Sequence, residues 1–151
     1  MRIPKENFDK IKALIFKALD DDVMPAYDAV GSCLYRDTEG HACGIGALIP
    51  EDYPHLADIA DCEGSIDAVI SELGADVMLG LPVLQGVVDQ SAAFDFLYDL
   101  QEVHDDTVHG YYATRSRYEL KKRYRATRSR YELQKLLRDR YTAFFQSEET
   151  V

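Results

Sequence analysis

Four side chains in the first half of the chain carry donor atoms that zinc prefers. Thiolates and imidazoles are the usual ligands of structural zinc, and such sites bring their cysteines in pairs two to four residues apart. Here the spacing is C-x7-H-x-C with one more cysteine downstream, and the four residues are Cys33, His41, Cys43 and Cys62. This spacing is not typical of a zinc site. We therefore expect core thiols that behave as small hydrophobic side chains, no bound metal and no cofactor.

A nucleophilic pair of Cys43 and His41 is the next chemistry that these residue types suggest. A cysteine nucleophile needs a base, a third group that orients the base, and donors for the oxyanion, and the sequence supplies no sign of the last two. It also lacks a phosphate-binding glycine loop, a serine nucleophile motif and a paired-carboxylate motif. We therefore predict that the protein is not an enzyme.

The strongest strand–turn–strand pattern, GSCLYRDTEGHACGIGALIP at residues 31–50, positions these side chains. A three-residue loop that ends in the left-handed conformation at Gly40 places Asp37 opposite His41 and Tyr35 opposite Cys43. A four-residue loop would place Tyr35 opposite Ala42 and separate the cysteines, which fits less well. With the shorter loop, side-chain alternation gives one face an apolar set that packs on helices: Cys33, Tyr35, Cys43 and Ile45.

Glycines mark two further features of the pattern. Gly44 and Gly46 leave the second strand nearly bare on its other face, which is typical of close approach by another backbone or a ligand. Farther along, Ser65 has the residue type of a helix N-cap, and Gly74 is a plausible stop for the helix that follows it.

The remainder of the chain reads mainly as helix. Apolar residues at helical spacing predict one helix over about residues 5–20 and another over about 91–106. The acidic segment 51–64 is expected to be a loop with one short helical turn, and residues 83–88 a short helix or buried turn. These elements predict an α+β fold, mostly α-helical, in which helices pack a small two-stranded antiparallel hairpin that is followed by a long basic C-terminal helix.

Composition places the protein in a reducing compartment without a membrane span. No apolar run approaches 18 residues, and the N-terminus lacks the apolar region of a signal peptide. Three cysteines form no disulfide framework. We therefore expect a cytoplasmic protein with reduced thiols and no membrane contact.

Charge divides the chain into two parts. Residues 1–110 carry 6 basic and 22 acidic groups, whereas residues 111–140 carry 11 basic and 3 acidic groups. We expect an acidic core domain at 1–110 and a basic helical arm at 111–151, a layout that bears on partners rather than on fold.

One face of the expected helix at 91–106 is acidic, with carboxylates three and four residues apart. A solvated face is the favoured interpretation, because charged residues are rarely buried. A docking surface for a protein partner is the functional alternative. The four residues of this acidic docking face are Asp95, Asp99, Glu102 and Asp106.

The arm contains a tandem repeat. Residues 113–125 read ATRSRYELKKRYR and residues 126–138 read ATRSRYELQKLLR, with ten of thirteen positions identical. In a continuous helix thirteen steps leave a rotation of roughly 220°, so the two copies cannot extend one apolar stripe. The second copy and its end add an apolar set that we expect to pack on something: Leu133, Leu136, Leu137, Tyr141, Phe144 and Phe145.

Three roles for the arm stay open. It can fold back over the acidic body of its own chain, it can join two chains into a homodimer through its apolar end, or it can bind nucleic acid by phosphate contacts and base stacking. Folding over an acidic body, its own or a neighbour's, is favoured over nucleic-acid binding, since 22 acidic groups compete for the arm. Between these two bodies the homodimer is favoured, because a long projecting helix reaches a neighbour more easily than its own core. The residues that would carry nucleic-acid binding or self-association are Arg115, Arg117, Tyr118, Lys121, Lys122, Arg123, Arg125, Arg128, Arg130 and Tyr131.

Two motifs resemble those of a family of small uncharacterised proteins of tailed phages and proteobacterial prophages. The first is a Cys-x-Tyr-Arg hairpin with a Cys-x-Ile-Gly strand, and the second is a Leu-Gln-x-x-His-Asp helix end at 100–105. The likeness covers about residues 8–106, and the arm has no counterpart in it. The resemblance implies a phage or prophage accessory protein that acts in the bacterial cytoplasm, and it implies no catalytic residue. Together with the acidic body and the missing catalytic motifs, it leads us to expect a protein that binds a bacterial host protein, in one specific form as an inhibitor. The hairpin motif comprises Cys33, Tyr35, Arg36, Gly40, Cys43 and Gly46.

Overall fold

Helices dominate the computed structural model, which describes residues 2–26, 34–37, 39–62, 64–113 and 127–150, without the side chains of 112–113 and 127–129. Within these ranges the protein has six α-helices, two short 3₁₀ helices and no β-strand. The helices are α1 (Lys5–Asp20), α2 (Leu56–Asp61), α3 (Ile66–Leu73), α4 (Asp76–Leu79), α5 (Gln90–Ala113) and α7 (Thr127–Thr150), and the 3₁₀ turns are η1 (Gly46–Leu48) and η2 (Pro82–Leu84). The expectation of a mostly α-helical protein is confirmed.

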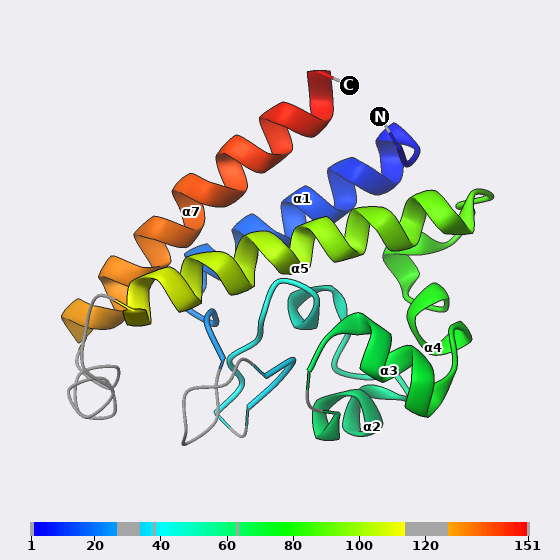
Figure 1. Cartoon of the computed structure of the whole chain (residues 1–151), viewed down its shortest axis with the longest axis horizontal. Coiled ribbons are helices and arrows are strands. Elements are labelled where there is room, and N and C mark those ends of the chain that lie inside the picture. Colours follow the sequence, from blue (N-terminus) through cyan, green and yellow to red (C-terminus); the bar gives the residue numbers. More distant parts are fainter. Residues whose placement is uncertain (1, 27–33, 38, 63, 114–126, 151) are drawn as a thin grey trace.

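The three long helices α1, α5 and α7 lie side by side, and α5 and α7 run antiparallel (Figure 1). Their apolar stripes recur every three or four residues and meet in an aromatic cluster. The ring of Phe8 on α1 lies 5.9 Å from Phe96 on α5 and 5.5 Å from Phe145 on α7, both edge to face. These edge contacts join all three helices in one core.

The short helices α2, α3 and α4 lie below α5 in the same view (Figure 1). Ile66 and Val69 of α3 are fully buried, and Gly74 ends that helix with a φ of 92°. Ser65 precedes α3 as expected, but its side chain makes no capping hydrogen bond. Instead the Gln101 side chain of α5 accepts the backbone N–H of Ile66 at 3.1 Å, so α5 holds the start of α3.

The expected two-stranded hairpin is reduced to one antiparallel bridge between Arg36 and Ala42 in the described residues. The predicted register is confirmed, since Cys43 donates its N–H to the Tyr35 carbonyl at 3.2 Å and Gly40 has a φ of 88°. The prediction of a second strand through residue 46 is wrong. The chain turns helical at Ile45 (φ −70°, ψ −41°) and enters η1, so pairing ends after one bridge.

The prediction of a close backbone approach is confirmed at Gly46, whereas the neighbour of Gly44 is a side chain. A Cβ on Gly46 would lie 1.8 Å from the carbonyl oxygen of Tyr35, and a Cβ on Gly44 would lie 2.2 Å from the hydroxyl of Tyr141. The first contact is with backbone of the same hairpin. The second is with α7, so the hairpin seats the C-terminal helix.

Helix α5 is longer than expected, because its apolar stripe continues past residue 106. Val108 and Tyr111 are buried and extend the stripe by another two turns, while Gly110 lies exposed in the helix. Helix α1 follows its predicted bounds. None of the helices in the described ranges is long and apolar enough to cross a membrane.

Candidate functional site

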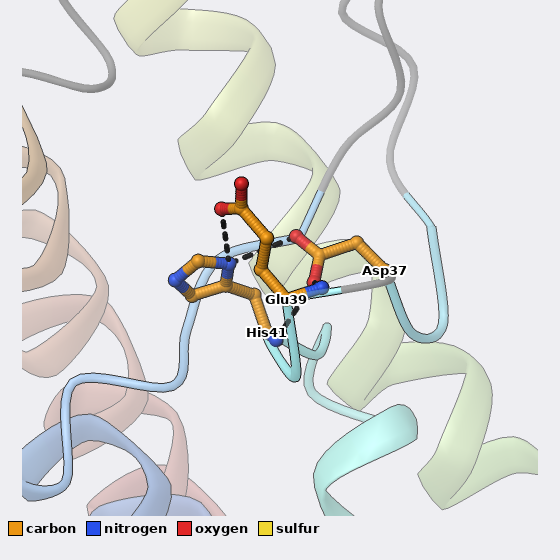
Figure 2. Close-up of side chains that lie close together, drawn as sticks. All are labelled: Asp37, Glu39 and His41. Atoms are coloured by element: carbon orange, nitrogen blue, oxygen red, sulfur yellow. Dashed lines mark hydrogen bonds and ion pairs between the residues drawn. The ribbon is translucent and has the colours of Figure 1, made fainter.

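Three ionisable side chains converge at the tip of the hairpin. The Nδ1 atom of His41 lies 2.9 Å from a carboxylate oxygen of Asp37 and 3.8 Å from one of Glu39 (Figure 2). The side chains of His41 and Asp37 are 9% and 15% exposed, whereas that of Glu39 is 63% exposed. The turn therefore holds an inner pair and an outer carboxylate that faces solvent.

The backbone of the turn fixes the Asp37 carboxylate. Its Oδ1 atom accepts the N–H groups of Glu39 and His41, both at 2.9 Å, in the manner of an Asx turn. The Asp37 N–H donates to the His41 carbonyl at 3.0 Å and closes the loop. With Oδ1 held in this way, Oδ2 points at the imidazole.

The cysteines do not join this cluster. Among the described residues, the one grouping of three metal-binding donors consists of Asp37, Glu39 and His41, without a thiol. Burial raises the pKa of the Cys43 thiol to about 12, and burial with hydrogen bonding to Glu72 raises that of Cys62 to about 11. Both thiols stay protonated at neutral pH and are poor nucleophiles and ligands. Cys33 lies outside the described residues.

Sequence reasoning selected His41 but paired it with cysteines rather than carboxylates. The available signal was the alternation Asp-x-Glu-x-His across a loop that ends at a left-handed glycine. Such a loop brings residues two and four apart to the same side, whereas a search by zinc-finger spacing passes over them.

The two motifs of the phage-protein resemblance meet in the interior. Gln101 of α5 donates to the Tyr35 hydroxyl at 3.3 Å, and the N–H of Gly46 donates to the Cys43 sulfur at 3.3 Å. Tyr35 and Cys43 are both 3% exposed, and burial raises the pKa of the Tyr35 hydroxyl. The residues of the two motifs thus hold the hairpin against α5, so their role is structural.

His104 is the most enclosed polar residue of the second motif. It is fully buried, its ring lies 6.5 Å from that of Tyr141, and neither ring nitrogen has a hydrogen-bond partner in the described part of the chain. Burial lowers the pKa of His104 to about 4, with a smaller contribution from His109. The imidazole is therefore neutral at pH 7 and acts as a packing residue.

Arg36, the hairpin cation, clamps the segment that follows η1. Its guanidinium donates to the carbonyls of Gly46 and Ile49 and pairs with Glu51. The side chain is 15% exposed. Arg36 therefore serves the fold, and it is also the last cation before a long anionic stretch.

Between Arg36 and Arg115 the chain contains 16 acidic residues and not one Lys or Arg. This stretch runs from the hairpin turn through η1 to the end of α5. Most of its carboxylates are exposed, among them Asp58 and Asp61 on α2, Asp76 on α4 and Asp95 on α5. Each of these four lacks an ion-pair partner within the residues the structure describes.

The acidic docking face of α5 borders an open groove of about 480 Å³ between α5 and α7. Three of its four carboxylates line the groove, and Asp95 does not. Asp99 is bound by Arg2 at 2.6 Å, whereas Glu102 and Asp106 are exposed and form no ion pair in the described ranges. The groove also has apolar side chains and one cation; its full lining is Asp99, Glu102, Val103, Asp106, Thr107, Arg140, Ala143 and Phe144.

The second repeat of the arm folds over its own chain. Leu133, Leu137, Tyr141 and Phe145 recur every four residues and are all buried. Arg138 pairs with Asp20, and Arg130 pairs with Asp22 at 3.3 Å. Much of the apolar end on which the homodimer prediction relied is thus buried in the protein's own core, although Leu136 is 42% exposed.

The first repeat lies outside the described residues, together with its candidate contacts Arg115, Arg117, Tyr118, Lys121, Lys122, Arg123 and Arg125. In the second repeat the Arg128 side chain is not described, and Tyr131 is 67% exposed. Nucleic-acid binding and charge-driven self-association by the arm remain predictions. No protein-family model, no curated protein and no solved structure matches this chain.

Proposed function

We propose that this protein binds a basic surface of another protein through the acidic docking face of α5. The observation that carries the proposal is the pair Glu102 and Asp106, two exposed carboxylates one helical turn apart on the rim of a groove. No cation from the part of the chain that the structure describes is bound to them. Like charges at this spacing repel each other and destabilise the helix slightly. A partner's cations would remove that cost.

The lining of the groove favours a protein as the ligand rather than a simple cation. Its lining combines the carboxylates with the half-buried side chains of Val103 and Phe144. Protein interfaces join an apolar centre to a polar rim, and a partner with a Lys or Arg beside an apolar residue would match both parts. Charge complementarity of this kind mainly increases the association rate and the specificity.

The biological setting follows from the motif resemblance and belongs to the same proposal. A phage or prophage accessory protein in the bacterial cytoplasm would meet host proteins that bind nucleic acids, whose grooves are basic. An acidic protein that occupies such a groove inhibits it by competition. The high pKa of Cys43 and the enclosed His104 supply no reactive centre, which favours this non-enzymatic role.

Affinity capture from bacterial lysate with matched variants tests the proposal. The Glu102→Gln, Asp106→Asn double variant removes both charges and keeps side-chain size, and Asp58→Asn, Asp61→Asn on α2 is the control with the same change in net charge. We expect the wild type and the control to capture the same protein, and the groove variant to lose most of it. Capture should also weaken as salt rises.

Two outcomes would contradict the proposal. If the groove variant and the control capture equal amounts, the carboxylates of α5 are a solvated face. If no protein is captured and the purified chain converts a substrate in an activity screen, the protein is an enzyme.

A further inference from the structure

We propose that Asp37, Glu39 and His41 form a binding site for one Zn²⁺ ion at the tip of the hairpin. The site is separate from the docking face of α5 and does not depend on the proposed function. It uses one imidazole nitrogen and two carboxylate oxygens, all within 4.8 Å of one another. Each is a recognised zinc donor, and a site with three protein ligands leaves a fourth position for water.

The spacing of the donors matches a coordination sphere. Two ligands that each lie about 2.1 Å from a zinc ion, at angles between a right angle and a tetrahedral angle, are roughly 3.0–3.4 Å apart. The His41 Nδ1 to Asp37 distance is 2.9 Å, and the Nδ1 to Glu39 distance is 3.8 Å. Closing the second distance requires a movement of about half an ångström, at the end of an exposed and flexible glutamate.

The inner part of the site is already positioned. Two backbone N–H groups at 2.9 Å hold Oδ1 of Asp37 and leave Oδ2 toward the imidazole. The His41 side chain is 9% exposed, so packing restricts its rotation. Ligands fixed in this way lose little freedom when the metal binds.

A hydrogen bond from the imidazole explains the orientation of the Asp37 carboxylate but not that of the Glu39 carboxylate. Asp37 takes part in four hydrogen bonds with backbone groups of the turn. The Glu39 carboxylate takes part in none of the turn's hydrogen bonds among the described residues and still turns toward the same nitrogen (Figure 2). Two carboxylates that converge on one atom repel each other unless positive charge lies between them. An imidazolium or a metal ion supplies such charge, but only a metal ion, which takes the place of a proton on Nδ1, uses all three donors as ligands.

The donor set also selects the metal. Imidazole favours Zn²⁺ and its transition-metal neighbours, whereas Mg²⁺ prefers a shell made of oxygen atoms and water. The expected ligand is therefore Zn²⁺ rather than Mg²⁺. When bound, it would tie the loop across Gly40 and brace the hairpin that seats α7.

Glu39→Gln is the decisive variant, because Glu39 is exposed and the change leaves the hydrogen bonds of the turn intact. The experiment is isothermal titration of the full chain with ZnCl₂ in the presence of a non-thiol reductant, after removal of any affinity tag. We expect the wild type to bind one Zn²⁺ and to melt several degrees higher with it. Affinity should fall at least about tenfold in Glu39→Gln and stay unchanged in His55→Gln, an exposed histidine elsewhere.

Four results would overturn the proposal. The first is no saturable binding of Zn²⁺ by the wild type, and the second is equal affinity in the wild type and Glu39→Gln. The third is equally tight binding of Mg²⁺, which would indicate unspecific attraction to an acidic protein. The fourth is loss of binding in Cys62→Ser with Glu39→Gln unaffected, which would assign the metal to thiols.

Discussion

Two regions of this molecule treat their charges in opposite ways. On α1 and α7, acidic residues are matched by cations of the same chain, for example Asp9 with Lys5 at 2.8 Å and Glu149 with Lys12 at 2.8 Å. From the hairpin turn to the end of α5, sixteen carboxylates follow one another without a Lys or Arg in the sequence. The first region holds its own helices together, and the second presents charge outward.

The contrast separates charges that contribute to packing, on α1 and α7, from charges that do not, on α2 to α5. Surface ion pairs are each worth little, so the pairs between α1 and α7 add only slightly to a contact that apolar burial drives. Uncompensated carboxylates on α2 to α5 contribute nothing to that contact. Repulsion among them costs a little stability, and a binding role is one explanation for a cost that the fold itself does not require.

The largest expected effect is on the packed side of α7. Phe145→Ala removes a ring that is 1% exposed and touches rings on α1, so we expect the free energy of unfolding to fall by about 3–5 kcal/mol. Tyr131→Ala is the control, since its side chain is 67% exposed, and a change within about 0.5 kcal/mol is expected. Denaturant unfolding measures both. Similar small effects in the two variants would show that α7 does not belong to this core.

The second prediction concerns pH and the interior between α5 and α7. The pKa of His104 is lowered from 6.5 to about 4, so the unfolded chain binds the proton more tightly than the folded one. Above pH 6.5 His104 is neutral in both states and does not lower the free energy of unfolding. As the pH falls toward 4, protonation of His104 in the unfolded chain lowers that free energy, by about 2 kcal/mol at pH 5. His104→Leu should abolish this loss.

Comparison of wild type with His104→Leu at pH 7 and pH 5 isolates the effect, because the many carboxylates titrate equally in both proteins. His55→Gln is the matched control, since His55 is exposed and, unlike His109, does not contribute to the lowered pKa of His104. If wild type and His104→Leu lose the same stability between the two pH values, the histidine is hydrated rather than enclosed.

The third prediction tests how the hairpin seats α7. Gly44→Ala places a methyl group 2.2 Å from the Tyr141 hydroxyl, and overpacking of this kind costs about 1–3 kcal/mol. Tyr141→Phe removes the oxygen and should relieve most of the clash in the double variant. A double-mutant cycle gives the coupling, and a coupling near zero would mean that the two residues are not in contact.

The smallest effects compare the two charge patterns directly. Arg138→Gln breaks its pair with Asp20 and its contact with the Phe16 ring at 5.7 Å, so we expect a loss of roughly 0.5–1 kcal/mol. The Glu102→Gln, Asp106→Asn variant relieves a repulsion and should gain a few tenths of a kcal/mol. Denaturant unfolding at low salt should therefore show changes in the free energy of unfolding of opposite sign in the two variants. Changes of the same sign would show that the two regions do not differ in how they use their charges.

Sequence reasoning was most successful where one local rule decides the structure. The stripe from Phe8 to Leu19 and the glycine at 74 predicted α1 and the end of α3, since spacing and backbone conformation depend on neighbouring residues alone. It failed where tertiary contacts decide. The strand after Cys43 turned into η1, and Gln101 rather than the Ser65 side chain holds the start of α3.

The candidate sites follow the same rule. The acidic face of α5 was visible as a spacing of three and four residues, but its groove requires Phe144 and Arg140 from a helix forty residues away. At the hairpin, Gly40 and the register predicted that Asp37 and His41 face each other. The turn of Glu39 toward the same nitrogen depends on its rotamer, which no sequence pattern specifies.

Carbodiimide coupling, mapped by mass spectrometry, tests most directly whether the carboxylates of α5 serve a partner. The reagent joins a carboxylate to an amine at ion-pair distance. In the free chain we expect couplings within the first region, such as Lys12 to Glu149 and Lys17 to Asp21. With the captured partner bound, the partner's lysines should couple to Glu102 and Asp106. Coupling of the partner to other carboxylates only, with none at Glu102 or Asp106, would contradict the proposed docking face.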